Sequence, residues 1–241
     1  HLYLYDLETG ELKNSITEGE WLVRDLVAFN ADNREVFAQT AGRVTGRDPY
    51  YRDLVRINID TGEITTLASS DHEYVAIADR NHNKVLMSGL VRDVSNACSL
   101  SPTGSFAVVT RSRADEVPVS FIVDRDGNQV LDLEVADISA LPNGWQWPEP
   151  VKLVAADGET DIYGLIYRPS DFSPEKSYPV ISHVFNAPEV PFVAKGSFSN
   201  AIFLGWFYLD AAALAELGFI VVQIDGRGSP YRNKAFQDES Y

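Results

Sequence analysis

Two polar turns near the C-terminal end of the chain hold the side chains that could take part in chemistry. Phe185-Asn186-Ala187-Pro188 follows one apolar run, and Asp225-Gly226-Arg227-Gly228 follows another. Ligands of α/β sheets bind at the carboxyl ends of strands, so Asp225 and Arg227 could line a binding crevice. They could also be structural, because tight turns need glycines that tolerate positive φ and polar side chains that fix neighbouring loops. For these two residues we prefer the structural interpretation.

A serine nucleophile is not found near these turns. In an α/β-hydrolase it lies in a Gly-x-Ser-x-Gly turn and is followed by Asp or Glu and then by His. No Gly-x-Ser-x-Gly occurs in the 241 residues, and the nearby serines lie outside any such motif: Ser182, Ser197, Ser199 and Ser229. His183 comes too early to be the His of such a triad. We expect it to be a hydrogen-bonded core residue.

The second turn requires a parallel crossover to position it. Residues 180–185 predict a strand that is covered on both faces, because they are almost continuously apolar. Residues 209–217 predict a helix closed by Gly218, and residues 219–224 predict a second buried strand. Strand, helix and strand of these lengths are typical of a parallel βαβ unit.

A hairpin precedes this crossover. Residues 151–155 and 161–167 alternate as strands do, and Asp157-Gly158 between them is a strong hairpin signal. Residues 151–241 therefore predict the N-terminal part of an α/β-hydrolase domain.

Residues 1–140 predict an all-β region with an internal repeat. Residues 3–12 align with residues 55–64: in both, alternating apolar residues precede a Thr-Gly turn and a returning strand. A second pattern, an apolar strand end followed by a tight polar turn and another strand, occurs at residues 29–37 and again at residues 100–108. A third turn, residues 124–127, fits this pattern more loosely.

Hairpins that recur about every 50 residues favour four-stranded propeller blades. A β-sandwich would give similar strands but not the repeated Thr-Gly-Glu hairpin. There is room for two or three blades, whereas a closed propeller needs at least about four. We therefore expect a partial β-propeller and an excised portion of a longer protein.

Residues 141–150 predict a linker between the two regions, because three prolines and a glycine interrupt regular structure. Trp145 and Trp147 are expected to pack at this boundary; binding of an aromatic ligand is the alternative.

Charge, apolar runs and motif spacing disfavour several classes of function. The net charge of −15 disfavours nucleic acid as a partner. No apolar run approaches the roughly 20 residues of a membrane-spanning helix, and no signal peptide is present in this stretch. Cys98 is the one cysteine, and no metal-ligand spacing or phosphate-binding loop is found, so neither metal nor cofactor is predicted. The compartment, periplasm or cytoplasm, is left open.

Four segments together carry a resemblance: Tyr163–Pro169, Tyr178–Ile181, the turn Phe185–Pro188 and Leu217–Ser229. They resemble the prolyl oligopeptidase family of serine peptidases, and most of all its dipeptidyl peptidase IV branch, which joins a propeller to an α/β-hydrolase domain. The sequence likeness extends over about residues 145–241. In the β region the likeness is one of architecture alone.

The resemblance implies cleavage of short peptides by a Ser-Asp-His triad, whose members would follow Tyr241, so the chain alone is expected to be inactive. The Glu pair that grips the substrate's amino terminus in dipeptidyl members is not identified here. A peptide substrate is the implied partner, and a homodimer is implied by analogy. Two alternatives stay open: a non-catalytic interaction module, or an acylaminoacyl peptidase or esterase of the same fold.

One catalytic position of the family falls inside the chain. The family usually has a Tyr at the start of the first turn, and its hydroxyl helps to form the oxyanion hole. Here Phe185 has the ring without the donor. Three explanations fit: Asn186 supplies the donor, the parent enzyme is slow or degenerate, or the strand is offset by one residue. Phe185 and Asn186 are therefore predicted only to occupy the oxyanion-hole position.

Overall fold

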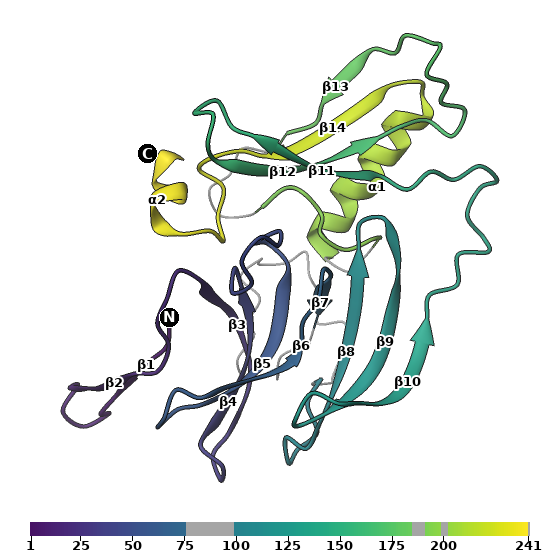
Figure 1. Ribbon diagram of the computed structural model, residues 1–241. Helices are drawn as coiled ribbons and strands as arrows, with labels where there is room; N and C mark the ends of the chain where they lie inside the picture. Colours follow the sequence, from purple (N-terminus) through teal and green to yellow (C-terminus); the bar gives the residue numbers. More distant parts are fainter. Residues whose placement is uncertain (76–98, 185–190, 199–201, 241) are drawn as a thin grey trace. The chain divides into compact units, whose positions relative to one another are not determined.

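The computed structural model describes residues 1–75, 99–184, 191–198 and 202–240 (Figure 1). The chain divides into two compact units, one formed by His1–Arg111 with Val119–Glu134 and the other by Ser112–Pro118 with Val135–Tyr241. The boundaries predicted at residues 140 and 150 remain a prediction. Cys98 lies outside the described residues.

The first unit is built from β-strands. They are β1 (Tyr3–Tyr5), β2 (Leu12–Ser15), β3 (Leu22–Asn30), β4 (Glu35–Ala41), β5 (Arg52–Asn58), β6 (Ile64–Ala68), β7 (Glu73–Val75), β8 (Phe106–Arg113), β9 (Glu116–Asp124) and β10 (Gln129–Val135). β1 and β2 form a hairpin, and the other strands form two four-stranded sheets with the orders β3-β4-β5-β6 and β10-β9-β8-β7 (Figure 1). The tip of the β8–β9 hairpin and Val135 belong to the second unit.

In each sheet, strands that are consecutive along the chain are neighbours, as they are in a propeller blade. The side chains between the two sheets form a buried apolar cluster that includes Val27, Phe37 and Leu54 from the first sheet and Val109 and Phe121 from the second. The fold is thus mostly β and consistent with a propeller region.

The predicted repeat is confirmed in its hydrogen bonds. In the β1–β2 hairpin, Asp6 N–H donates to the Glu11 carbonyl (2.8 Å) and Gly10 N–H donates to the Asp6 carbonyl (3.0 Å). In the β5–β6 hairpin, Asn58 takes the place of Asp6 and makes the equivalent bonds with Glu63 (3.0 Å) and Gly62 (2.9 Å). In both turns the Asx side chain also accepts the N–H groups two and three residues further on. The shared Asx-x-x-Thr-Gly sequence therefore builds the same turn twice.

The two turns differ in what surrounds their glycines, and this gives a matched test. Gly10 has φ +73° with open space where a Cβ would lie, whereas Gly62 has φ +74° and its Cβ would lie 2.8 Å from the Ile16 carbonyl oxygen. Gly10→Ala should cost about 1 kcal/mol, which is the strain of a left-handed alanine. Gly62→Ala should cost more, because the backbone must also move. Urea unfolding of both variants measures the difference, and equal losses would contradict the prediction.

The second unit contains a mixed sheet and one long helix. Its elements are β11 (Glu149–Val154), β12 (Asp161–Tyr167), β13 (Val180–Ser182), α1 (Ile202–Glu216), β14 (Ile220–Asp225), α2 (Lys234–Gln237) and a 3₁₀ turn (Asp238–Ser240). The sheet order is β11-β12-β14-β13, in which β11 pairs antiparallel with β12, and β13 pairs parallel with β14 (Figure 1).

The parallel crossover and the hairpin around Asp157-Gly158 are both confirmed. α1 ends at Glu216, one residue before the predicted end. Gly218 follows it as predicted: it takes φ +94°, and its N–H donates to the Ala215 carbonyl at 2.9 Å. The helix begins at Ile202, earlier than the Ala- and Leu-rich segment from residue 209 indicated. No helix within the described ranges has both the length and the apolar character needed to span a membrane.

The prediction that residues 180–185 are covered on both faces is wrong for the described part of that strand. Val180 is 65% exposed, and Ser182 is exposed as well. The reason is position: β13 lies at the edge of the described sheet, and α1 packs mainly against β14 and β12. An apolar run predicts a strand, but it does not show what covers it.

Candidate functional site

Of the sequence-predicted site residues, the structure describes Asp225 and Arg227, which lie at the C-terminal end of β14. Phe185 and Asn186, the predicted oxyanion-hole position, fall outside the described residues. Asp225 is the last residue of β14, and Arg227 lies in the turn that follows.

The Asp225 carboxylate holds a loop of the second unit in place. It is 3% exposed, and its two oxygens accept the backbone N–H groups of Phe192 (2.7 Å) and Val193 (3.1 Å). Phe192 and Val193 are themselves buried. Asp225 thus provides hydrogen-bond acceptors for the backbone N–H groups of two buried residues.

Arg227 links two other turns. Its guanidinium donates to Asp157 Oδ2 (2.9 Å), in the β11–β12 turn, and also pairs with Glu239 in the 3₁₀ turn. The pKa of Asp157 is lowered to about 2, first by the Thr160 hydroxyl, then by the backbone N–H groups of Thr160 and Glu159, and to a smaller extent by Arg227. These contacts support the structural interpretation of Arg227.

A buried polar network beside these residues was not found by sequence reasoning. Gln223 is 0% exposed in the middle of β14. Its Oε1 accepts from the Tyr167 hydroxyl (3.1 Å), and its Nε2 donates to the Phe207 carbonyl (3.0 Å) and lies 3.1 Å from His183 Nδ1. One feature of the sequence could have indicated this network: Gln223 is the one side-chain amide in the otherwise apolar run 219–224.

Tyr167, which belongs to this network, packs against a second buried tyrosine, Tyr208. Tyr167 and Tyr208 lie edge to face with ring centroids 5.6 Å apart. Burial raises the pKa of both hydroxyls well above the ordinary value. Both therefore stay protonated donors at neutral pH, Tyr167 to Gln223 and Tyr208 to the Ala114 carbonyl at 3.0 Å.

The network determines the tautomer of His183. The Phe207 carbonyl can only accept, so the nitrogen of the Gln223 amide must point toward it. That nitrogen then offers its second N–H to His183 Nδ1, which must be the unprotonated ring nitrogen. His183 is thus held as the Nε2–H form, two residues before Phe185.

We expect long-range ¹H–¹⁵N correlation spectra near pH 7.5 to show His183 with an unprotonated Nδ1 and a protonated Nε2. The histidines number 4, so His183→Asn identifies the signal by its disappearance. Gln223→Met, which removes the donor, should shift the equilibrium between the two tautomers. A wild-type spectrum with Nδ1 protonated would contradict the proposed network.

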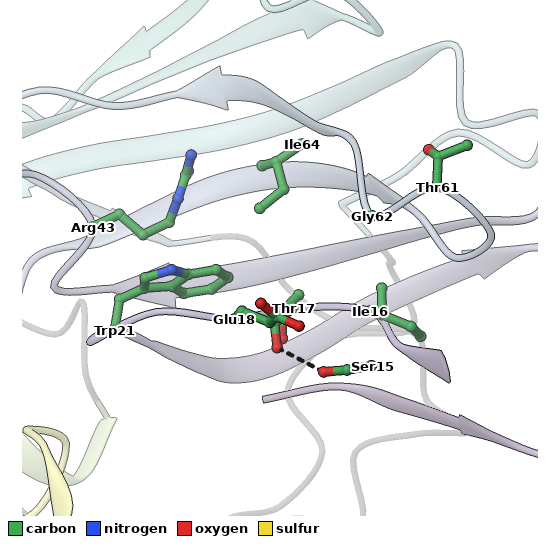
Figure 2. A pocket seen from close by; sticks show the side chains of 9 residues that line it. All are labelled: Ser15, Ile16, Thr17, Glu18, Trp21, Arg43, Thr61, Gly62 and Ile64. Carbon is green, nitrogen blue, oxygen red and sulfur yellow. Dashed lines mark hydrogen bonds between the residues drawn. The ribbon is translucent and has the colours of Figure 1, made fainter. Parts of the chain in front are cut away.

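A separate cavity of about 530 Å³ lies in the first unit (Figure 2). Its lining combines one cation, one carboxylate, one aromatic ring, hydroxyls and aliphatic side chains: Ser15, Ile16, Thr17, Glu18, Trp21, Arg43, Thr61, Gly62 and Ile64. Within the described ranges, no group of three or more His, Cys, Asp or Glu side chains could hold a metal ion.

The architecture thus combines a β-rich region of propeller type with a small α/β unit, and comparison with known proteins agrees with this class. Residues 1–90 match the family described as Dipeptidyl peptidase IV (DPP IV) N-terminal region. Mouse dipeptidyl peptidase 8 is 37% identical over 90 residues, which is 37% of this chain and 9% of that protein. The chain is therefore homologous to dipeptidyl peptidases over part of its length.

Other relatives match nearly the whole chain at lower identity. The Aspergillus fumigatus protein named Probable dipeptidyl peptidase 4 is 24% identical over 245 residues, which is 98% of this chain and 27% of that protein. A solved structure from Bacteroides ovatus, described as a dipeptidyl aminopeptidase IV, is 25% identical with a TM-score of 0.69, and the match covers 96% of this chain and 28% of that one. The chain therefore spans less than a third of the length of these relatives.

Proposed function

We propose that this chain is part of a serine dipeptidyl peptidase. Its first unit would contribute blades of a β-propeller, and its second unit would contribute the opening strands of an α/β-hydrolase domain. The observation that carries the proposal is the match to the Bacteroides ovatus structure, because it extends over 96% of the chain and so includes both units. The parallel β13–α1–β14 crossover, with a polar turn after β14, supports the hydrolase assignment.

The reaction of the parent enzyme would be acyl transfer. A serine attacks the carbonyl of the scissile bond, a histidine takes its proton and passes it to the leaving amine, and an aspartate orients the histidine. The residues of this chain would form the framework of that site. In the sequence, β13 is followed by Phe185 and Asn186, which would occupy the oxyanion-hole position, and Asp225 fixes the loop beside the end of β14. A peptide substrate and a homodimer remain part of the proposal.

A non-catalytic module is the second candidate. The observation that favours it is Phe185, since a ring without a hydroxyl cannot donate a hydrogen bond to an oxyanion. In this case the propeller and the α/β unit would serve as an interaction surface.

The test is an activity assay on the intact gene product with a chromogenic Xaa-Pro dipeptide substrate, together with the sequence that follows residue 241. We expect a Gly-x-Ser-x-Gly motif in that sequence, and release of dipeptides that a serine-directed reagent blocks. The 241-residue chain should show no hydrolysis. Absence of the motif would favour the non-catalytic module, and blocked hydrolysis by the chain alone would refute its predicted inactivity.

A further inference from the structure

The cavity in the first unit has the size of a small-molecule site. Its volume of about 530 Å³ lies within the roughly 300–1,000 Å³ that is usual for ligand pockets. It is formed by the segment from Ser15 to Trp21, by Arg43 and by the β5–β6 turn (Figure 2). Those elements meet through strand pairing within one unit.

Arg43 supplies a positive charge with unused donors. Its guanidinium lies 5.6 Å from the centroid of the Trp21 ring. In the described part of the chain its one hydrogen bond goes to Thr66 Oγ1 at 3.4 Å, although a guanidinium has five N–H donors. Burial lowers the pKa of Arg43, and the charge of Asp53 acts in the opposite direction. Arginine remains protonated in proteins, so this side chain is a cation with free donors.

The acidic groups nearby do not neutralise Arg43 directly. Asp53 is fully buried and its Oδ2 is paired with Arg47 Nη2 at 2.8 Å, so two guanidinium groups lie close to one carboxylate. Glu18 lines the cavity but forms no ion pair with Arg43 among the described residues.

The cavity also has an apolar side. The Trp21 ring, stacked on Arg43 and in edge contact with His1 (5.6 Å), forms one wall. Ile16 and Ile64 add aliphatic surface, and Ser15 and Thr61 add hydroxyls at the edge. A ligand that fits must therefore present an anionic group to Arg43 and an apolar group to Trp21.

We propose that this cavity binds a small molecule that carries a single carboxylate and an apolar group, with the carboxylate on Arg43 and the apolar group against Trp21. A carboxylate matches the planar fork of a guanidinium. A monoanion is favoured over a phosphate dianion, because the cavity offers one uncompensated cation, Glu18 lies on its lining, and the chain has a net charge of −15.

The test uses the 241-residue chain with phenylacetate as the probe, followed by NMR of the tryptophan indole N–H groups. The tryptophans number 4, and Trp21→Phe identifies the Trp21 signal. We expect phenylacetate to shift the Trp21 signal saturably, while the neutral analogue phenylacetamide and inorganic phosphate produce at least about tenfold weaker effects. Charge-assisted hydrogen bonds account for a difference of this size.

Variants separate binding from folding. Arg43→Gln should weaken phenylacetate binding at least about tenfold, and Arg43→Lys should weaken it less, because it keeps the charge but loses the fork. Arg34→Gln is the matched control: it removes an equally charged but exposed residue, paired with Asp60 and outside the cavity, and should leave binding unchanged. Thermal unfolding confirms that each variant is folded.

The proposal would be overturned by a linear, non-saturating shift. Equal binding of phenylacetamide and phenylacetate to the wild-type chain would overturn it as well. So would phenylacetate affinities of folded Arg43→Gln or Arg43→Lys protein that equal the wild-type affinity. None of these results bears on the dipeptidyl peptidase proposal, because the assay does not measure hydrolysis.

Discussion

Replacement of Asp225 by alanine is expected to lower the free energy of unfolding of the chain by about 3–5 kcal/mol. The carboxylate is 3% exposed and accepts the backbone N–H groups of Phe192 and Val193. Alanine leaves both buried donors without this acceptor, and each lost partner costs about 1–3 kcal/mol. Urea unfolding followed by circular dichroism measures the loss.

Two further variants show that the loss comes from these donors. Asp225→Asn keeps one acceptor oxygen but turns an amide N–H₂ toward the second donor, so an intermediate loss is expected. Asp137→Ala removes a fully exposed carboxylate of the same unit that accepts the Ser139 N–H at 2.8 Å, and its loss should be much smaller. If Asp225→Ala and Asp137→Ala had similar effects, the buried bonds of Asp225 would not be important for stability.

The largest effect on activity is expected at Phe185 and Asn186, in the intact enzyme. If the parent enzyme lacks the oxyanion donor, Phe185→Tyr should restore it and raise kcat by about 10²–10³-fold. If Asn186 supplies the donor, Asn186→Ala should lower kcat by about the same factor, while Phe185→Tyr has little effect. Steady-state kinetics on a dipeptide substrate, with KM measured separately, distinguish the two cases.

A donor that acts on the developing oxyanion changes kcat more than KM, because its bond strengthens in the transition state. We therefore expect at least one of the two variants to change kcat by about 10²-fold. If neither does, the turn is not at the oxyanion position, and the strand is offset relative to the family. A change confined to KM would also argue against an oxyanion role.

Local structure could be predicted from sequence where one short motif determines it. The Thr-Gly turns at Gly10 and Gly62 were predicted as equivalent and have equivalent hydrogen bonds, because an Asx side chain and a glycine at positive φ act within a few residues of each other. The parallel crossover was also predicted, since a strand, a helix and a strand of these lengths have few other arrangements.

Burial and side-chain partners could not be predicted in the same way. Residues 180–182 look like a buried strand, yet Val180 is 65% exposed, because exposure depends on which elements lie over β13. The sequence favours a structural role for Asp225 and Arg227, but it does not show which residues they contact. Their partners, Phe192 and Asp157, are distant in sequence and could not be identified from the turn itself.

The sequence alone determined the turns, the strand and helix types and the absence of a Gly-x-Ser-x-Gly motif, because each of these is a property of neighbouring residues. The tertiary structure decided which distant side chains meet. Gln223 reaches Tyr167 across 56 positions, and Arg43 stacks on Trp21 beside a cavity. Such contacts form only when strand pairing brings separate segments together, so the buried network and the cavity could be found only in the folded chain.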